Sequence, residues 1–204
     1  MTNEPHVKLV AIYGSPRRNG NTDTLLDAAT KGAQDAGAAV QRVYLRDMSF
    51  VPCQNCGYCG RTGVCRFKDD MVAVYEALEQ SDIILLAAPI YFCSLCAQAK
   101  AMVDRCQPYW SRKYVLKTGP PARFARGGFI CCGGFKDDRF LACTEQIVKT
   151  WYYIMGVSYE GPCFVPGLDA AGDAAKHPAA TQLALDYGKN LVVSVRKRAE
   201  GQGS

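Results

Sequence analysis

Histidine is scarce in this sequence. It occurs twice in 204 residues, as His6 in the N-terminal segment and as His177 in a proline-flanked stretch. Histidine is the side chain most often used for acid–base catalysis near neutral pH. No Ser/His/Asp arrangement and no pair of carboxylates with catalytic spacing is visible either. The sequence therefore gives no indication of a hydrolytic site built from side chains.

Long apolar segments and a strong charge imbalance are also missing. No run approaches the roughly 20 apolar residues that a membrane span needs, and the N-terminal "MTNEPHVK" lacks the apolar core of a signal peptide. Lysine and arginine number 24 against 19 acidic residues, and the one dense basic run is "VRKRAEG" near the C-terminus. We therefore expect a cytoplasmic protein that binds neither membranes nor nucleic acids.

Cysteine, by contrast, is abundant, with an odd total of eleven. In a reducing compartment, neighbouring cysteines more often bind metal or carry redox chemistry than form disulfides. Four of them share the stretch "CQNCGYCGRTGVC", as Cys53, Cys56, Cys59 and Cys65. This stretch is the most informative feature of the chain.

The spacing of these four cysteines separates the candidate metals. Structural zinc sites usually join two C-x₂-C pairs across a long spacer. Three cysteines at two-residue gaps are typical of [4Fe–4S] ligation, and here the fourth lies close enough for one short loop to close the site. Gly57, Gly60 and Gly63 would let the backbone curl around it. The spacing favours a [4Fe–4S] cluster, while zinc, another use of the thiols, and a loop without metal stay open.

Short apolar runs alternate with helical patterns along the chain. The pattern predicts strands at 7–14, 39–45, 82–91, 127–134 and 158–167. It predicts helices at 22–37, 69–80, 97–106, 139–156 and 180–199. We therefore predict an α/β fold with one doubly wound, mostly parallel five-stranded sheet. Residues 1–204 would form a single domain, with a cysteine-rich loop at 51–68 inserted after the second strand.

Three loops at the carboxyl ends of the predicted strands, where such sheets bind ligands, carry suitable groups. "GSPRRNGNT" (14–22) is not a Walker A sequence, but its backbone N–H groups and Arg17 would suit a phosphate. A plain helix cap is the alternative. Pro89 and Tyr91 follow the third strand, and Gly133 with Gly134 follows the fourth. Together the loops suggest a mononucleotide with a flat ring.

These motifs carry a resemblance to a known family. "GSPRRNGNT", "PIYFCSLCAQAKAMVDR" and "CCGGF" resemble the flavodoxin-like NAD(P)H-dependent FMN reductases, from about residue 7 to 165. "CQNCGYCGRTGVCRFKDDM" resembles the iron–sulfur flavoproteins of anaerobes, a branch whose compact cysteine motif carries a [4Fe–4S] cluster.

The resemblance implies roles for individual residues. The FMN phosphate would be held by Ser15, Arg17, Asn21 and Thr22. The isoalloxazine ring would be lined by Pro89, Ile90, Tyr91, Phe92, Gly133 and Gly134. The cluster would be ligated by Cys53, Cys56, Cys59 and Cys65. Pro16 and Gly20 would shape the phosphate loop, and Lys100, Asp104 and Arg105 match a helix pattern that we expect to be structural.

The chain departs from its relatives in its further cysteines. Cys93 and Cys96 stand where relatives usually have small or polar residues, and Cys131 and Cys132 are adjacent in the fourth strand. Extra thiol chemistry near the ring is one reading. Small buried apolar residues are the other, since free cysteines commonly pack as such.

Three functions follow as hypotheses. The first is an iron–sulfur flavoprotein that passes electrons between a ferredoxin-like carrier, a [4Fe–4S] cluster and FMN, with no catalytic side chain of its own. The second is an FMN or quinone reductase without a cluster that uses NAD(P)H. The third is a non-enzymatic flavodoxin-like carrier. The resemblance also implies a homo-oligomer, either a dimer or a tetramer.

Overall fold

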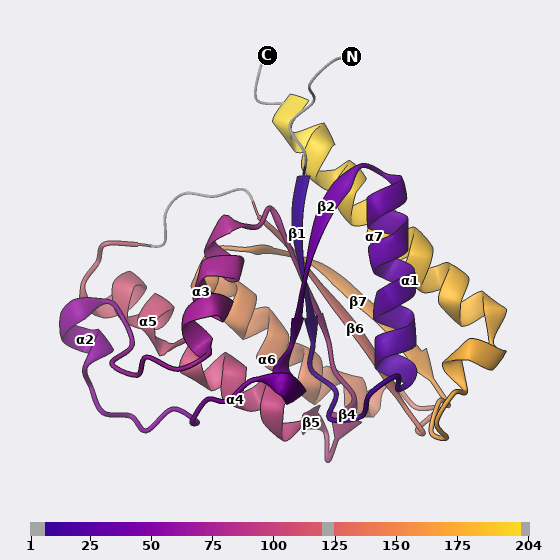
Figure 1. The fold of residues 1–204 in the computed structure, drawn as a ribbon, viewed down its shortest axis with the longest axis horizontal. Helices are drawn as coiled ribbons and strands as arrows, with labels where there is room; N and C mark the ends of the chain where they lie inside the picture. Colours follow the sequence, from indigo (N-terminus) through magenta and orange to yellow (C-terminus); the bar gives the residue numbers. More distant parts are fainter. Residues whose placement is uncertain (1–6, 120–124, 201–204) are drawn as a thin grey trace.

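The computed structural model of the protein describes residues 7–119 and 125–200, with side chains up to residue 198. Its main feature is a five-stranded sheet in the order β2-β1-β3-β6-β7 (Figure 1). Every neighbouring pair in this sheet is parallel. The strands are β1 (Val7–Tyr13), β2 (Ala38–Tyr44), β3 (Ile83–Ala87), β6 (Arg126–Gly133) and β7 (Ser158–Pro166). The predicted fold class is confirmed. The extent of the domain stays a prediction.

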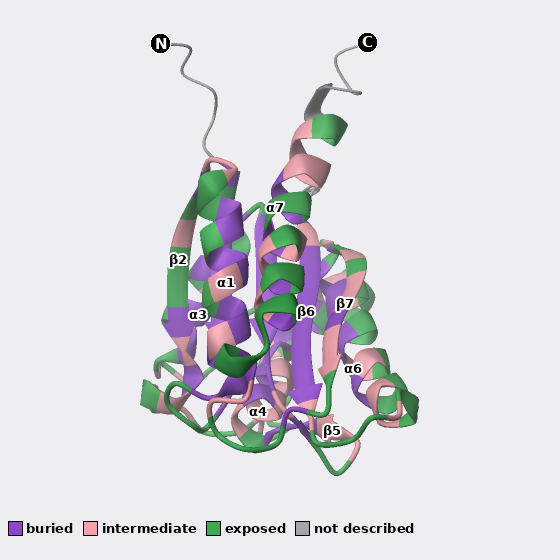
Figure 2. Ribbon diagram, turned by 90° about the vertical axis from the view of Figure 1, so that its right-hand side faces the viewer, coloured by how far each residue is buried: buried purple, intermediate pink, exposed green. Residues whose placement is uncertain are grey.

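Helices cover both faces of the sheet. Figure 2 shows one face behind α1 (Asn21–Asp35) and α7 (Pro178–Glu200). The other face carries α3 (Met71–Gln80), α4 (Ala97–Arg105) and α6 (Arg139–Met155) (Figure 1). No helix in the described ranges is long and apolar enough to cross a membrane.

The strands form two cores because their side chains alternate between the faces. In β1, Val10 and Ile12 belong to the core under α3, α4 and α6, whereas Leu9 and Ala11 belong to the core under α1 and α7. All four are essentially inaccessible to solvent. Burial on both faces explains why the central strands β1, β3 and β6 read as continuous apolar runs, whereas the edge strand β2 alternates.

The predicted strand 82–91 is too long. The central strand β3 ends at Ala87, and a separate two-stranded hairpin follows, made of β4 (Ile90–Tyr91) and β5 (Ser94–Leu95). Pro89 lacks a backbone N–H and so interrupts the ladder between them. The hairpin projects at the carboxyl edge of the sheet (Figure 1).

Short helical segments also lie where no helix was predicted. They are η1 (Leu45–Asp47), α2 (Cys59–Thr62), α5 (Gln107–Trp110), η2 (Ser111–Val115) and η3 (Ala174–Lys176). Their lengths of three to five residues leave no helical periodicity to detect in the sequence. One of them, α2, lies within the cysteine-rich loop, and α5 packs against it.

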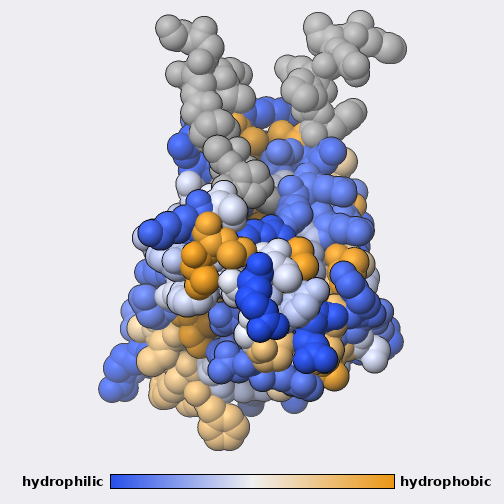
Figure 3. Space-filling view, turned by 90° about the vertical axis from the view of Figure 1, so that its left-hand side faces the viewer, coloured by the Kyte–Doolittle hydropathy of each residue, from blue (hydrophilic) through white to orange (hydrophobic). Residues whose placement is uncertain are grey.

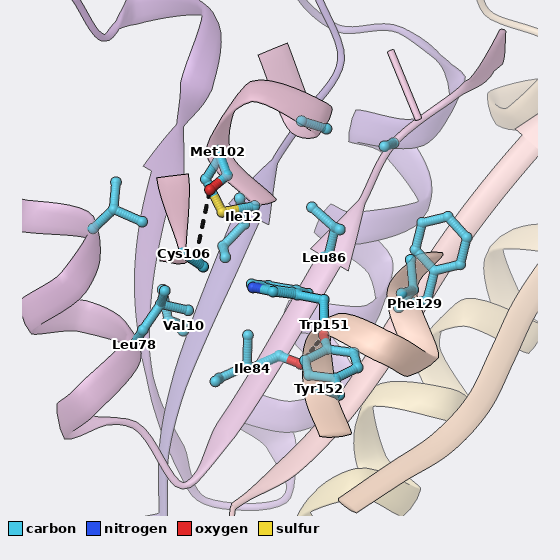
Figure 4. Packing of buried hydrophobic residues seen from close by; sticks show 14 of the residues in the cluster. Val10, Ile12, Leu78, Ile84, Leu86, Met102, Cys106, Phe129, Trp151 and Tyr152 are labelled. Atoms are coloured by element: carbon cyan, nitrogen blue, oxygen red, sulfur yellow. Dashed lines mark hydrogen bonds between the residues drawn. The ribbon is translucent and has the colours of Figure 1, made fainter. Parts of the chain in front are cut away.

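The first glycine pair of "GGFICCGG" serves packing. The Tyr152 hydroxyl lies 2.8 Å from the Gly128 carbonyl oxygen and 2.9 Å from that of Ile84. A Cβ added at Gly127 would come within 2.8 Å of the Tyr152 ring. Figure 4 shows this ring beside Trp151 and Ile84 in the core. Gly127 is therefore required by the close approach of α6 to β6 and not by a ligand.

Glycine also sets the contact between α1 and α7. A Cβ added at Gly188 would overlap the Ala29 carbonyl oxygen, and one added at Gly32 would overlap that of Leu185. Each helix thus presents a glycine to the backbone of the other. The two helices approach more closely than side chains would allow.

We predict that Gly188→Ala destabilises the protein by about 3 kcal/mol, because the added methyl group forces the two helices apart. Urea unfolding followed by circular dichroism measures the change. Gly60→Ala is the matched control, since a Cβ at this helical glycine meets no atom within 4 Å. It should be neutral or slightly stabilising. Equal effects of the two substitutions would contradict the close contact.

Candidate functional site

A cavity of about 370 Å³ opens at the carboxyl edge of the sheet. It is lined by Ser15, Arg17, Gly20, Asn21, Thr22, Pro89, Ile90, Tyr91, Cys132, Gly133, Gly134, Phe135, Leu168 and Asp169. Nine of the ten residues assigned to FMN in the sequence therefore border one cavity, although they come from three separate loops. Phe92 is the exception, because it occupies the turn of the hairpin and is fully exposed.

One end of the cavity is formed by the phosphate loop, residues 14–22, and the start of α1. Gly20 is the N-cap of α1 and offers no side-chain hydrogen bond to the first turn. The first N–H groups of a helix have no partner within the helix, and the helix dipole makes this end positive. Ser15, which is 4% exposed, accepts a hydrogen bond from the Arg17 N–H on its hydroxyl oxygen at 3.1 Å. These groups suit an anion such as a phosphate.

The side chain of Asn21, which the resemblance assigns to the FMN phosphate, is bonded to the loop after β7. Its amide donates to the Ala170 carbonyl oxygen at 2.9 Å, and its oxygen accepts the Ala174 N–H at 3.0 Å. It thereby fastens the loop after β7 to the start of α1. The same loop places Leu168 and Asp169 at the cavity wall, and no local pattern in the sequence predicts them there.

Arg46 contacts the backbone of the phosphate loop. It is not among the candidate site residues predicted from the sequence. Its guanidinium pairs with Asp23 at 2.9 Å, and both side chains are less than a tenth exposed. The same group lies 3.4 Å from the Ser15 carbonyl oxygen and 3.3 Å from that of Arg17. Burial raises the pKa of the Asp23 carboxyl, although the Arg46 charge acts in the opposite direction. The positive charge of Arg46 offsets a carboxylate that would otherwise repel an anion at this helix end.

The other end of the cavity suits a flat ring. Pro89, Ile90 and Tyr91 form one side, and Gly133 lies at the end of β6 opposite. A Cβ added at Gly133 would meet no protein atom within 4 Å, so a side chain there would extend into open space. The absence of a side chain therefore leaves room for a ligand to approach the backbone. The cavity fits FMN in both its anion-binding end and its ring end.

The hairpin beside the ring end has a strained turn. Phe92 and Cys93 have φ angles of 49° and 58°, in the left-handed region that bulky side chains disfavour. Two consecutive positive φ angles are typical of the tight turns that join hairpin strands. Tyr91, before this turn, lines the cavity, and Phe92 within it is exposed to solvent.

The extra cysteines near the ring are mostly buried. Cys96 donates its thiol hydrogen to the Gly14 carbonyl oxygen at 2.8 Å, and burial raises the pKa of this thiol. Burial also raises the pKa of Cys131, and that of Cys132 to about 12. A thiol that stays protonated is a weak nucleophile and a weak metal ligand. These three residues act as small apolar residues and favour the packing interpretation.

A second cavity, of about 140 Å³, lies within the cysteine loop, residues 51–68. It is lined by Cys53, Gln54, Asn55, Cys56, Gly57, Cys59, Gly60, Cys65, Arg66, Phe67, Arg105, Gln107, Pro108, Trp110 and Ser111. All four predicted ligands thus face one space. The described side chains do not include a group of three or more His, Cys, Asp or Glu gathered closely enough to hold a metal ion.

The backbone of this loop is tightly curled. Asn55, Gly57 and Gly63 have φ angles of 48°, 70° and 73°. The Tyr58 N–H donates to Cys56, and this bond together with nearby Arg66 lowers the pKa of the Cys56 thiol. The Ser111 hydroxyl lies 3.3 Å from the Cys59 sulfur. Four thiols around one cavity, with N–H and O–H donors aimed at sulfur, are the donor set that a [4Fe–4S] cluster needs.

The cysteine loop lies on the far side of α3 and α4 from α1 (Figure 1). Figure 3 shows this face, where hydrophobic side chains stand among hydrophilic ones. Tyr58 and Val64 of the loop are 38% and 43% exposed. The two cavities have no lining residue in common.

Comparison with known proteins agrees with this geometry. The family model described as NADPH-dependent FMN reductase matches residues 7–147. An iron–sulfur flavoprotein of Archaeoglobus fulgidus is 33% identical over 147 residues, which cover 71% of this chain and 64% of that protein. An iron–sulfur flavoprotein of Methanosarcina thermophila is 31% identical over 155 residues, which cover 76% of this chain and 78% of that protein.

Solved structures support the fold. An NAD(P)H:quinone oxidoreductase from Methanothermobacter marburgensis superposes with a TM-score of 0.70 at 15% identity, over 91% of this chain and 97% of that one. An FMN-dependent NADH-azoreductase from Bacillus anthracis gives a TM-score of 0.65 at 12% identity, over 93% of this chain and 99% of that one. At these identities the likeness concerns the fold alone.

We predict that Arg46→Met lowers the free energy of unfolding by about 3 kcal/mol, because it leaves Asp23 buried without its partner. Urea unfolding measures the loss. The double variant Arg46→Met/Asp23→Asn should recover part of it, since no buried charge then remains. Lys31→Met is the control, because Lys31 pairs with Asp35 on an exposed face and should change stability little. Equal losses for the Arg46 and Lys31 variants would contradict the role of the buried pair.

Proposed function

Because this chain belongs to the NADPH-dependent FMN reductase family, we propose that it is an iron–sulfur flavoprotein, an oxidoreductase that exchanges electrons through FMN and a [4Fe–4S] cluster. The carrying observation is the presence of two cavities on one chain, one suited to FMN and one lined by four thiols. Relatives at 31% and 33% identity that are named iron–sulfur flavoproteins support it. The first of them is matched over less than two thirds of its length, so the reaction partners are inferred separately.

The residues of the larger cavity would hold FMN. Ser15, Thr22 and Arg17 would bind the phosphate together with the first N–H groups of α1. Asn21 would contribute its backbone, because its side chain holds the loop after β7. The ring would lie between the segment 89–91 and the backbone of Gly133 and Gly134.

The residues of the smaller cavity would hold the cluster. Its ligands would be the thiolates of Cys53, Cys56, Cys59 and Cys65. When bound, the flavin exchanges one or two electrons and the cluster exchanges one, which suits a relay between one-electron and two-electron partners. The chain's own part is to position both groups and to exclude water from them.

The family also suggests an electron donor and a homo-oligomer. The family is described as NADPH-dependent, so a nicotinamide is one donor, and a ferredoxin-like protein would be the one-electron partner. The two cavities share no lining residue, and a homo-oligomer would bring the cysteine loop of one copy to the FMN cavity of another. Such a protein would work in a reducing cytoplasm, where clustered thiols persist.

Anaerobic purification tests the proposal. Protein isolated without oxygen should carry about one FMN, four iron atoms and four sulfides per chain. FMN without iron would overturn the cluster and leave the family's second candidate, an FMN reductase without a cluster. That candidate is favoured by the thiols not being gathered around one ion among the described residues. Folded protein that takes up no FMN would overturn both.

We predict that Cys56→Ser removes most of the iron while the FMN content stays unchanged, because a hydroxyl is a poor replacement for a thiolate ligand. Iron analysis and the visible absorption spectrum of anaerobic protein give the two contents. Cys143→Ser is the matched control, since Cys143 is an exposed thiol on α6 outside the cysteine loop. Retention of iron by the Cys56 variant would remove Cys56 from the ligand set.

We predict that Arg17→Met weakens FMN binding about tenfold and leaves riboflavin binding unchanged, since riboflavin lacks the phosphate that the guanidinium would contact. Quenching of flavin fluorescence on titration gives both dissociation constants. Arg18→Met is the control, because the neighbouring arginine pairs with Asp47 instead of facing the cavity. Equal weakening of both flavins would assign Arg17 to the ring or to the fold.

A further inference from the structure

The cysteine loop starts and ends at one point, and a buried arginine lies there. Asp70 also joins the flanking segments, because its carboxylate accepts a hydrogen bond from the Ser49 N–H at 2.6 Å. Arg105, at the end of α4, is 1% exposed. Its Nη1 donates to the Val51 carbonyl oxygen at 2.6 Å and to Asp69 Oδ2 at 2.7 Å. Its Nη2 donates to Asp69 Oδ1 at 2.9 Å. One guanidinium therefore binds both the first residue of the loop and the residue that follows its last.

The carboxylate of Asp69 also binds backbone groups near both ends of the cysteine loop. Asp69 Oδ2 also accepts the Val51 N–H at 3.3 Å, and Asp69 Oδ1 accepts that of Met71 at 3.2 Å. Burial acts to raise the pKa of Asp69, but the hydrogen bond and charge of Arg105 keep it below its ordinary value. The pair is thus a charged, bidentate contact, which is the strong and directional form of a hydrogen bond between side chains.

Arg105 also forms part of the wall of the cysteine cavity. Its guanidinium carbon lies 5.3 Å from the centre of the Phe67 ring, which belongs to the loop. Its Nε is buried and has no hydrogen-bond partner within the described part of the chain. The residue therefore contacts the inside of the loop as well as its two ends.

We propose that Arg105 is the positioning residue of the cysteine site, which holds the ends of the loop together so that the four thiols face one cavity. For the identity of the bound group this rests on the proposed function. The clamp itself consists of contacts present without any cluster. Fixing the ends of a flexible segment removes much of the entropy cost of closing it, and this favours a loop that is ready for its ligand.

The test uses the full chain and two readouts. The first is trypsin cleavage within the loop, at Arg61, Arg66 and Lys68, in protein prepared without a cluster and analysed by mass spectrometry. The second is iron bound per FMN after anaerobic reconstitution. In Arg105→Met, loop cleavage should be about tenfold faster, as expected for the loss of a charge-assisted bond, and iron per FMN should fall several-fold. FMN affinity should stay within about twofold of the parent value.

Two further variants make the test decisive. Lys100→Met is the matched control, because Lys100 is on the same helix but pairs with Asp104 at the surface, and both readouts should be unchanged. Arg105→Lys keeps the charge but not the two-pronged contact, so it should give intermediate values, and it serves if the methionine variant does not fold. A merely structural role would lower FMN binding and iron binding together.

The outcomes separate this inference from the proposed function. If the parent protein takes up FMN but no iron, the cluster is wrong, while cleavage of the loop still tests the clamp. If the parent protein binds iron and the folded Arg105 variants keep both the iron and the slow cleavage, the clamp is wrong. Cleavage that speeds up equally in Lys100→Met would also overturn it.

Discussion

The register between β1 and β3 is the constraint on which the larger site depends. Tyr13 pairs with Ala87, and directly beyond this pair the Gly14 N–H donates to the Ala87 carbonyl oxygen at 2.8 Å. A Cβ at Gly14 would come within 2.8 Å of the same oxygen, so only glycine lets the chain turn here. The phosphate loop and the segment from Pro89 therefore leave adjacent strands at the same level. The anion end and the ring end of the cavity face each other because of this alignment.

The FMN cavity and the cysteine loop are positioned by different kinds of contact. The larger cavity lies at the ends of parallel strands, so the sheet fixes the points from which its loops start. The cysteine loop has no ladder of its own and extends from the sheet beyond α3 and α4 (Figure 1). It is joined to the rest of the chain by side-chain contacts, among them Arg105 with Asp69, Asp70 with the Ser49 N–H, and Arg112 with the Gly63 carbonyl oxygen.

The parts of the fold and of the larger site that follow from local sequence patterns could be predicted. β1 and β3 are apolar runs and β2 alternates, and five residues of "GSPRRNGNT" border the cavity because a strand-to-helix turn places them there. Contacts between residues far apart in the chain could not be predicted from these patterns. Nothing near Arg46 or Arg105 marks them as partners of Asp23 and Asp69, and Asn21 bonds to a residue 149 positions further along the chain, in the loop after β7. The hairpin after Pro89 was hidden within an apolar run that continues past the end of the strand.

Buried and exposed cysteines of this chain differ in the pKa of their thiols. Cys96, Cys131 and Cys132 lie in the core near the larger cavity, where burial raises the pKa of each thiol and keeps it protonated. Cys56 is exposed on a curled loop, where N–H donation from Tyr58 lowers the pKa of its thiol. Metal ligation requires the thiolate, which Cys56 therefore forms more readily than the buried cysteines do.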